Sequence, residues 1–191
     1  MEDKIKIDEK IEFHKSFYGL LDSFRATIAA LNYLQTSPTE AKKHFALFPY
    51  LIELPCCVTN KVVKIDKTIL DLVEKEGYNK EVPLYSKTLI DFYRIFTIAV
   101  KDIIWQEQDF KSLLLTPELN FLKHLRNASA HRNKFYFGEG KERLKVLSQL
   151  PILWKNKEIN EMSEGNDLYM DFMKPGDLFI LLSDISKLVK K

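Results

Sequence analysis

The sequence contains few of the residues that cross-link a chain, break it or tie it to a metal. Only two of its 191 residues are cysteines, the neighbours Cys56 and Cys57, and six are glycines. Adjacent cysteines seldom form a good disulfide, and no Cys/His spacing typical of a zinc site accompanies them. We therefore expect two small buried thiols in a reducing compartment, and neither a metal nor another cofactor.

A membrane segment and a strong charge of either sign are also missing. No apolar run approaches the ~20 residues that span a bilayer, and the N-terminus has no apolar segment typical of a signal peptide. The 29 Lys and Arg residues nearly balance the 27 Asp and Glu residues, for a net charge of +2. We expect a soluble, cytoplasmic protein with no membrane partner, in which any polyanion site is a local basic cluster.

Apolar and aromatic side chains, in contrast, are plentiful. Hydrophobic residues make up 46% of the chain, including 13 Phe and 8 Tyr. This supply is enough for an apolar core, and the length suits a single domain over residues 1–191.

Apolar side chains recur every three or four residues in several segments, which is the period of an amphipathic helix. The pattern predicts helices at about residues 8–35, from 38 onward, between 66 and 77, and at 83–107, 117–134 and 175–189. Residues 135–172 lack this period, and 152–159 favour a small hairpin. We expect an all-α fold, an antiparallel helical bundle with a small β-hairpin between the helix at 117–134 and the C-terminal helix.

The helix at 117–134 carries a spaced set of polar residues. Arg126 is followed directly by Asn127, and His131 comes four residues later. This pattern resembles the R-N-x-x-x-H motif of the HEPN family, which is found on a late helix of a short helical bundle. The resemblance covers most of the chain in architecture but only this segment in residues, and it implies a HEPN-like domain with its site here.

These residue types suit cleavage of RNA by its own 2′-hydroxyl group. Histidine can take or give a proton near neutral pH, and arginine presents a fork of donors to phosphate oxygens. Asn127 is placed to orient His131 or a phosphate. We predict that Arg126, His131 and Asn127 form a catalytic group that uses no metal.

Helix geometry bears on how this group would be assembled. Asn127 and His131 would lie about 40° apart around a straight helix, whereas Arg126 and His131 would lie about 140° apart. A second copy of the helix across a two-fold axis would bring the pair together. HEPN proteins typically pair in this manner, so the resemblance implies a homodimer with both motifs lining one cleft.

Further basic residues surround the motif. We interpret Lys123, Arg132, Lys134 and His124 as an RNA-binding strip, since His124 would project within about 20° of His131. Basic residues near the end of a helix also stabilise its negative end whatever the function, and for His124 alone a structural role is the stronger interpretation.

Three other residues are interpreted as structural. His14 and His44 are predicted to lie in helices without partners. Trp154, beside the predicted hairpin, is expected to pack against the helices rather than to stack on a base.

Two functions stay open on the sequence. The favoured one is a metal-independent endoribonuclease of toxin or defence type, which implies RNA as a partner and admits an antitoxin or another protein partner. The alternative is a non-catalytic HEPN-like helical module that binds a partner protein or a nucleotide. Family members of both kinds exist, so the resemblance does not decide between them.

Overall fold

The computed structural model describes residues 11–37, 43, 52–56, 61–65, 84–169 and 171–189. Over these residues the chain is mostly helical, as the sequence predicts. It divides into two compact units, one formed by residues 1–22 with 90–191 and the other by residues 23–89. Each unit is described by itself, and a single domain over residues 1–191 stays a prediction. No helix in the described part of the chain is long and apolar enough to cross a membrane.

The unit of residues 23–89 contains most of helix α1, Tyr18–Thr36, and a two-stranded antiparallel sheet. Strand β1, Ile52–Cys56, pairs with β2, Lys61–Ile65, with Ile52 opposite Ile65. The helices predicted from residue 38 onward and between 66 and 77 lie outside the described residues, as does His44.

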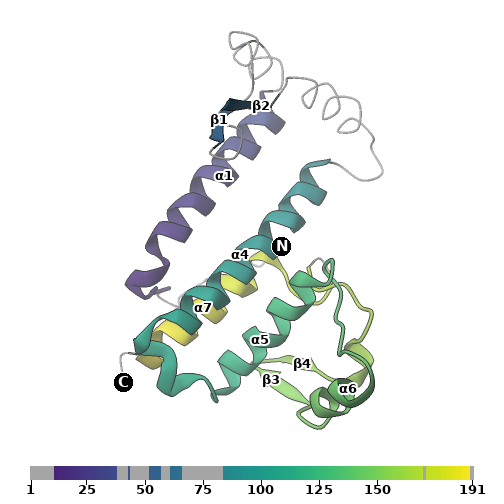
Figure 1. Ribbon diagram of the computed structural model, residues 1–191. Coiled ribbons are helices and arrows are strands. Elements are labelled where there is room, and N and C mark those ends of the chain that lie inside the picture. Colours follow the sequence, from purple (N-terminus) through teal and green to yellow (C-terminus); the bar gives the residue numbers. More distant parts are fainter. Residues whose placement is uncertain are drawn as a thin grey trace, which may run out of the picture. The chain divides into compact units, whose positions relative to one another are not determined.

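The larger unit contains the elements that carry the motif (Figure 1). In chain order they are most of α4 (Leu84–Gln106), η2 (Gln108–Leu113), α5 (Pro117–Ala130), α6 (Gly140–Leu147), β3 (Ile152–Trp154), β4 (Lys157–Ile159), η3 (Glu161–Ser163) and α7 (Pro175–Val189). Helix α5 contacts both β3 and α7, and α7 also contacts η2. The predicted helices at 83–107 and 175–189 and the predicted hairpin are thereby confirmed.

The core of this unit is built from the apolar stripes of the three long helices. Its fully buried members on these helices include Phe96, Val100 and Ile104 from α4, Leu119, Leu122 and Leu125 from α5, and Leu178, Leu181, Leu182 and Ile185 from α7. Each set recurs at the three- or four-residue spacing that puts side chains on one helix face. In the last turn of α5, Ala128 and Ser129 are still buried, and the chain reaches the surface at Ala130.

The first helix starts later than the predicted residue 8. Residues 11–14 precede it in a non-helical conformation because their main chain bonds to α7. The Glu12 and His14 N–H groups donate to the hydroxyl oxygens of Ser183 (3.2 Å) and Ser186 (2.8 Å). A short 3-10 helix η1, Lys15–Phe17, then leads into α1.

His14 is therefore neither helical nor without partners. Its Nδ1 accepts a hydrogen bond from the Ser16 N–H, and its Nε2 lies 3.3 Å from Oδ2 of Asp109. The ring also meets Phe110 edge-on, with 5.0 Å between the centroids. These contacts agree with a structural role, since they join the start of the chain to the η2 segment.

Candidate functional site

Helix α5 carries the first half of the motif. Thr116 precedes it in an extended conformation, and Pro117, with its fixed φ and no N–H to satisfy, suits the first helical position. The buried stripe of α5 includes Leu122 and Leu125. Arg126 and Asn127 follow this stripe and are partly exposed.

The helix ends before it reaches His131. Its last residue is Ala130, four residues earlier than predicted, and His131 caps the end with its N–H on the Asn127 carbonyl oxygen at 3.0 Å. A turn follows in which the Lys134 N–H donates to the His131 carbonyl oxygen at 3.1 Å. The predicted angle of about 140° between Arg126 and His131 assumed a continuous helix, so it does not apply. Among the described residues, no hydrogen bond joins these two side chains.

The His131 side chain lies at the surface against an aromatic ring. Its imidazole centroid is 4.7 Å from that of Tyr136, with the planes tilted by 49°. Tyr136 is 39% exposed. Desolvation, a hydrogen bond to Glu139 and the charges of nearby carboxylates raise the pKa of the phenol above its usual value. Tyr136 is therefore a neutral neighbour of His131 at physiological pH.

Arg126 is the motif residue with unmet hydrogen-bonding capacity. Its Nε is buried and has no hydrogen-bond partner in the described structure, while the side chain as a whole is partly exposed. A buried N–H without an acceptor is unfavourable, at roughly 1–3 kcal/mol.

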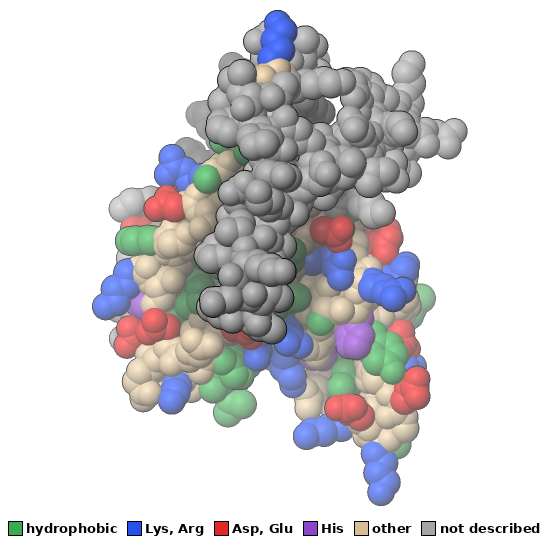
Figure 2. Space-filling view, turned by 45° about the horizontal axis from the view of Figure 1, so that its top comes forward, with side chains coloured by type: hydrophobic (Ala, Val, Ile, Leu, Met, Phe, Trp, Pro, Cys, Tyr) green, Lys and Arg blue, Asp and Glu red, His purple; other side chains and the backbone are tan. Residues whose placement is uncertain are grey.

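The remaining basic residues of the predicted strip differ in how accessible they are. Lys123 is partly exposed and Arg132 is exposed. Lys134 is exposed but engaged, because its Nζ lies 3.0 Å from Oδ1 of Asp167 and donates to the Gly165 carbonyl oxygen at 3.2 Å. Basic and acidic side chains are interspersed over the face in Figure 2, in line with the balanced composition.

His124 does not lie on this strip. Its residue exposure is 3%, and its ring meets Phe137 edge-on with 6.4 Å between centroids. Burial, with a smaller contribution from the charge of Lys123, lowers the pKa of the imidazole to about 4. His124 is therefore an uncharged core residue at neutral pH, and we do not include it in an RNA-binding surface. Its predicted alignment with His131 fails because His131 is outside the helix.

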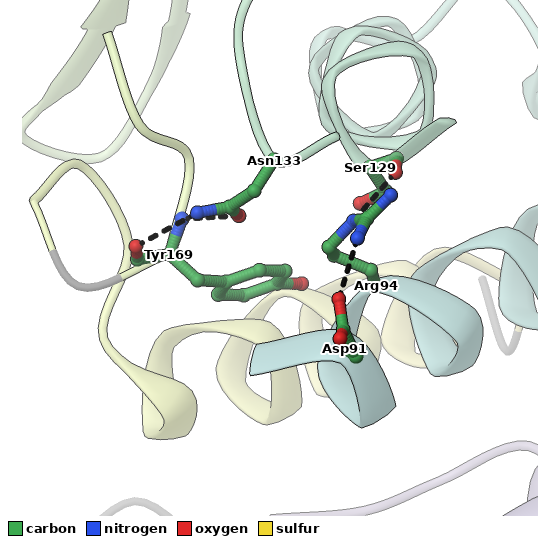
Figure 3. Close-up of polar contacts among 5 residues, drawn as sticks. All are labelled: Asp91, Arg94, Ser129, Asn133 and Tyr169. Carbon is green, nitrogen blue, oxygen red and sulfur yellow. Dashed lines mark hydrogen bonds and ion pairs between the residues drawn. The ribbon is translucent and has the colours of Figure 1, made fainter. Parts of the chain in front are cut away.

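Two polar contacts that the sequence analysis did not find hold the end of α5 in place (Figure 3). Arg94 of α4 donates from Nε to the Ser129 carbonyl oxygen at 2.9 Å, and its Nη1 lies 2.5 Å from Oδ1 of Asp91. Asn133 bonds through its side-chain amide to the main chain of Tyr169. The sequence carries no clear signal for the second contact, because its pattern predicted Asn133 within the helix, although asparagine is a residue that tolerates positive φ.

The described part of the chain contains no group of three or more His, Cys, Asp or Glu side chains that could hold a metal ion. Comparisons of the chain with protein-family models, with curated proteins and with solved structures found no match. The HEPN resemblance accordingly remains a hypothesis that rests on Arg126, Asn127 and His131.

Proposed function

We propose that the protein is a HEPN-like, metal-independent endoribonuclease of toxin or defence type, with its site at the C-terminal end of α5. The observation that carries the proposal is the pairing of an exposed histidine, His131, with an arginine whose Nε lacks an acceptor, Arg126, within one R-N-x-x-x-H segment. The proposal extends to the finer architecture, an antiparallel bundle of the long helices, and to a homodimer.

In the proposed reaction the RNA supplies its own nucleophile. His131 takes the proton of a 2′-hydroxyl, whose oxygen attacks the adjacent phosphorus atom. The bond to the 5′-oxygen of the next nucleotide breaks, which leaves a 2′,3′-cyclic phosphate and a 5′-hydroxyl. The leaving 5′-oxygen takes up a proton from water, and the His131 imidazolium later releases its proton to water, so protons and charges balance without a metal.

Arg126 and Asn127 would act on the phosphate rather than on protons. The guanidinium of Arg126 stays charged and can donate two parallel hydrogen bonds to non-bridging oxygens as negative charge develops on them. Asn127 would orient the phosphate or His131. Lys123 and Arg132, the accessible cations nearest in sequence, would bind neighbouring phosphates.

A direct assay tests this function. The purified protein is incubated with end-labelled RNA in EDTA, and the products are analysed for 2′,3′-cyclic phosphate ends. We expect such ends and no dependence on added Mg²⁺ or Mn²⁺. A strict metal requirement, or no product over a broad set of cellular RNAs, would contradict the proposal.

One observation favours the second candidate, a non-catalytic module that binds a protein partner. The ring beside His131 lies near Glu139 and Glu142, whose charges raise the pKa of Tyr136, and near Glu164, which is paired with Arg143. Carboxylates at this position would repel RNA and suit a basic protein surface. Binding of such a partner by a protein that leaves RNA intact would support this alternative.

A further inference from the structure

The turn that carries His131 adopts a backbone conformation that its residues do not favour. Arg132 and Asn133 have φ values of 56° and 70°, and the Lys134 N–H closes the turn on the His131 carbonyl oxygen. The left-handed region is unfavourable for an ordinary L-residue, because its Cβ approaches the following carbonyl oxygen too closely. Asparagine tolerates it, but arginine has no such allowance. Contacts elsewhere must therefore stabilise this turn.

Asn133 supplies those contacts. The residue is 8% exposed, and its Oδ1 accepts from the Tyr169 N–H at 2.9 Å while its Nδ2 donates to the Tyr169 carbonyl oxygen at 3.1 Å. Its own carbonyl oxygen accepts from the Leu168 N–H at 2.6 Å. Figure 3 shows the amide facing the Tyr169 main chain. Hydrogen bonds in a buried site stabilise the conformation that forms them, so the two amide bonds offset the strain of the turn.

The segment that receives the amide is itself fixed in the core. The Tyr169 side chain is almost fully buried, its hydroxyl forms a short hydrogen bond with the Thr97 hydroxyl of α4, and its ring lies 5.5 Å from that of Tyr93. On the other side of His131, the Arg94 side chain holds the Ser129 carbonyl oxygen. Only Ala130, His131 and Arg132 lie between these two anchored residues.

We propose that Asn133 is a positioning residue that fixes the His131 side chain through its amide contacts with Tyr169. The inference rests on the proposed ribonuclease function, in which His131 transfers the proton. Asn133 touches no substrate in this scheme. It sets where the His131 main chain leaves α5, and hence where the imidazole and the Arg132 side chain stand.

The variant Asn133→Gly separates the amide from the backbone conformation, because glycine adopts positive φ without strain. Asn160→Gly is the matched control. The Asn160 amide also makes two hydrogen bonds, accepting from the Met162 N–H at 3.0 Å and donating to Oε1 of Glu158 at 2.9 Å, but it belongs to the η3 turn. Both variants lose an amide with two partners through the same exchange.

Two measurements then decide the matter. In EDTA, N133G should lose at least about tenfold in kcat on RNA with less than about a threefold change in KM, since misplacing a proton-transfer group affects the reaction more than binding. The NMR signal of the His131 ring should also shift in N133G. N160G should match the wild type in kcat and in this signal. A wild-type kcat together with an unchanged His131 signal in N133G would overturn the proposal.

The NMR signal of the His131 ring distinguishes failure of the positioning proposal from failure of the ribonuclease proposal. If the wild type cleaves no RNA, the ribonuclease proposal fails. A shift of the His131 signal in N133G but not in N160G still supports the positioning role of Asn133. An unchanged His131 signal in N133G overturns that role. Asn133→Asp offers a second variant. A protonated carboxyl has one acceptor and one donor, like the amide. We therefore compare the His131 signals of N133D and the wild type at each of several pH values. The difference between them should become smaller as the pH falls and the introduced carboxylate is protonated.

Discussion

Arg126 and His131 are positioned by different parts of the fold, although only five positions separate them in the sequence. Arg126 belongs to the last turns of α5 and keeps a buried Nε without a partner in the described structure. His131 lies beyond the helix, at the surface and against Tyr136. The arginine is thus placed by helix packing and the histidine by the turn. Substitutions at the two positions should therefore affect stability differently while both abolish the proposed reaction.

We expect His131→Ala to reduce RNA cleavage at least about 10²-fold, because the proton-transfer group is lost. Arg126→Ala should reduce it as much or more, since the developing phosphate charge loses its partner. H131A should leave the unfolding free energy nearly unchanged, because the side chain is exposed. The measurements are initial rates on labelled RNA and urea unfolding. Arg25→Ala, an exposed arginine of α1, controls for the loss of positive charge. Wild-type rates in both H131A and R126A would disprove the enzymatic proposal.

Burial of His124 makes stability depend on pH. Its folded-state pKa is about 4 against 6.5 in the unfolded chain, so the unfolded state binds more protons in this interval. The unfolding free energy should be constant above about pH 6.5 and fall below it, by up to about 1.4 kcal/mol per pH unit and about 3 kcal/mol in total by pH 4. Urea unfolding at pH 7.5, 6 and 5 measures this. His124→Leu should remove most of the slope, and an equal slope in that variant would show that other groups cause it.

At the scale of elements, the sequence predicted the helices in which the apolar pattern repeats over many residues. The stripe of α7, from Leu178 to Ile185, places that helix at Pro175–Val189, where it was expected. The end of α5 was not predictable in this way, because Arg132 has no preference for positive φ and the amide of Asn133 acts through Tyr169, 36 residues away. Long-range contacts also move the start of the first helix, through Ser183 and Ser186.

Local sequence patterns and long-range contacts also contributed differently to the candidate site. The site itself stays a prediction from the residue types and spacing of Arg126, Asn127 and His131. Periodicity alone placed His124 on the same face as His131, and the early end of α5 removes that relation. The support from Arg94 could not be predicted, because its bond to Ser129 joins two helices that are separated in the sequence.

The β3–β4 hairpin packs against the core through Trp154. Trp154 is buried, its ring lies 5.4 Å from that of Phe121, and its Nε1 donates to Oδ2 of Asp184 at 3.2 Å. This position agrees with packing rather than with stacking on a base. Trp154→Ala should lower the unfolding free energy by about 3–5 kcal/mol. Trp154→Phe, which keeps a ring but loses the hydrogen bond, should cost about 1–2 kcal/mol.

Urea unfolding of the two Trp154 variants measures these costs. RNA affinity supplies the control, because a packing role leaves it unchanged in W154F under conditions where that variant is folded. A W154F protein of near wild-type stability that binds RNA tenfold more weakly would mean that the indole contacts RNA.

At the scale of the whole molecule, the nearly neutral charge limits how RNA can be held. Lys123 and Lys134 flank the motif, and of these two only Lys134 has an ion-pair partner among the described residues, Asp167. Releasing counterions from single-stranded RNA changes the logarithm of affinity by about 0.7 per logarithm of salt for each phosphate contact. Lys123→Ala should therefore flatten the salt dependence by about 0.7, and Lys134→Ala by much less. Binding titrations at four salt concentrations measure both slopes. Equal effects would mean that the Asp167 pair opens on RNA.

Assembly decides whether the two halves of the motif act within one protomer or across two. The structure gives no hydrogen bond between the described side chains of Arg126 and His131, and a two-fold axis would let each arginine serve the other protomer's histidine. We therefore expect light scattering to report about twice 22.4 kDa at micromolar concentration. Repulsion between the clustered cations should weaken this dimer at low salt unless RNA is bound.

Complementation between two inactive variants tests the shared site directly. When R126A and H131A are refolded together, about half of the dimers are mixed, and each mixed dimer keeps one of its two Arg126–His131 pairs intact. The mixture should therefore recover about a quarter of the wild-type rate, while each variant alone and the double variant mixed with itself stay inactive. If each protomer acts with its own pair, no mixture regains activity. A monomer that cleaves RNA, or a dimer without complementation, would disprove the shared cleft. The catalytic roles of Arg126 and His131 would then be tested by the single substitutions R126A and H131A alone.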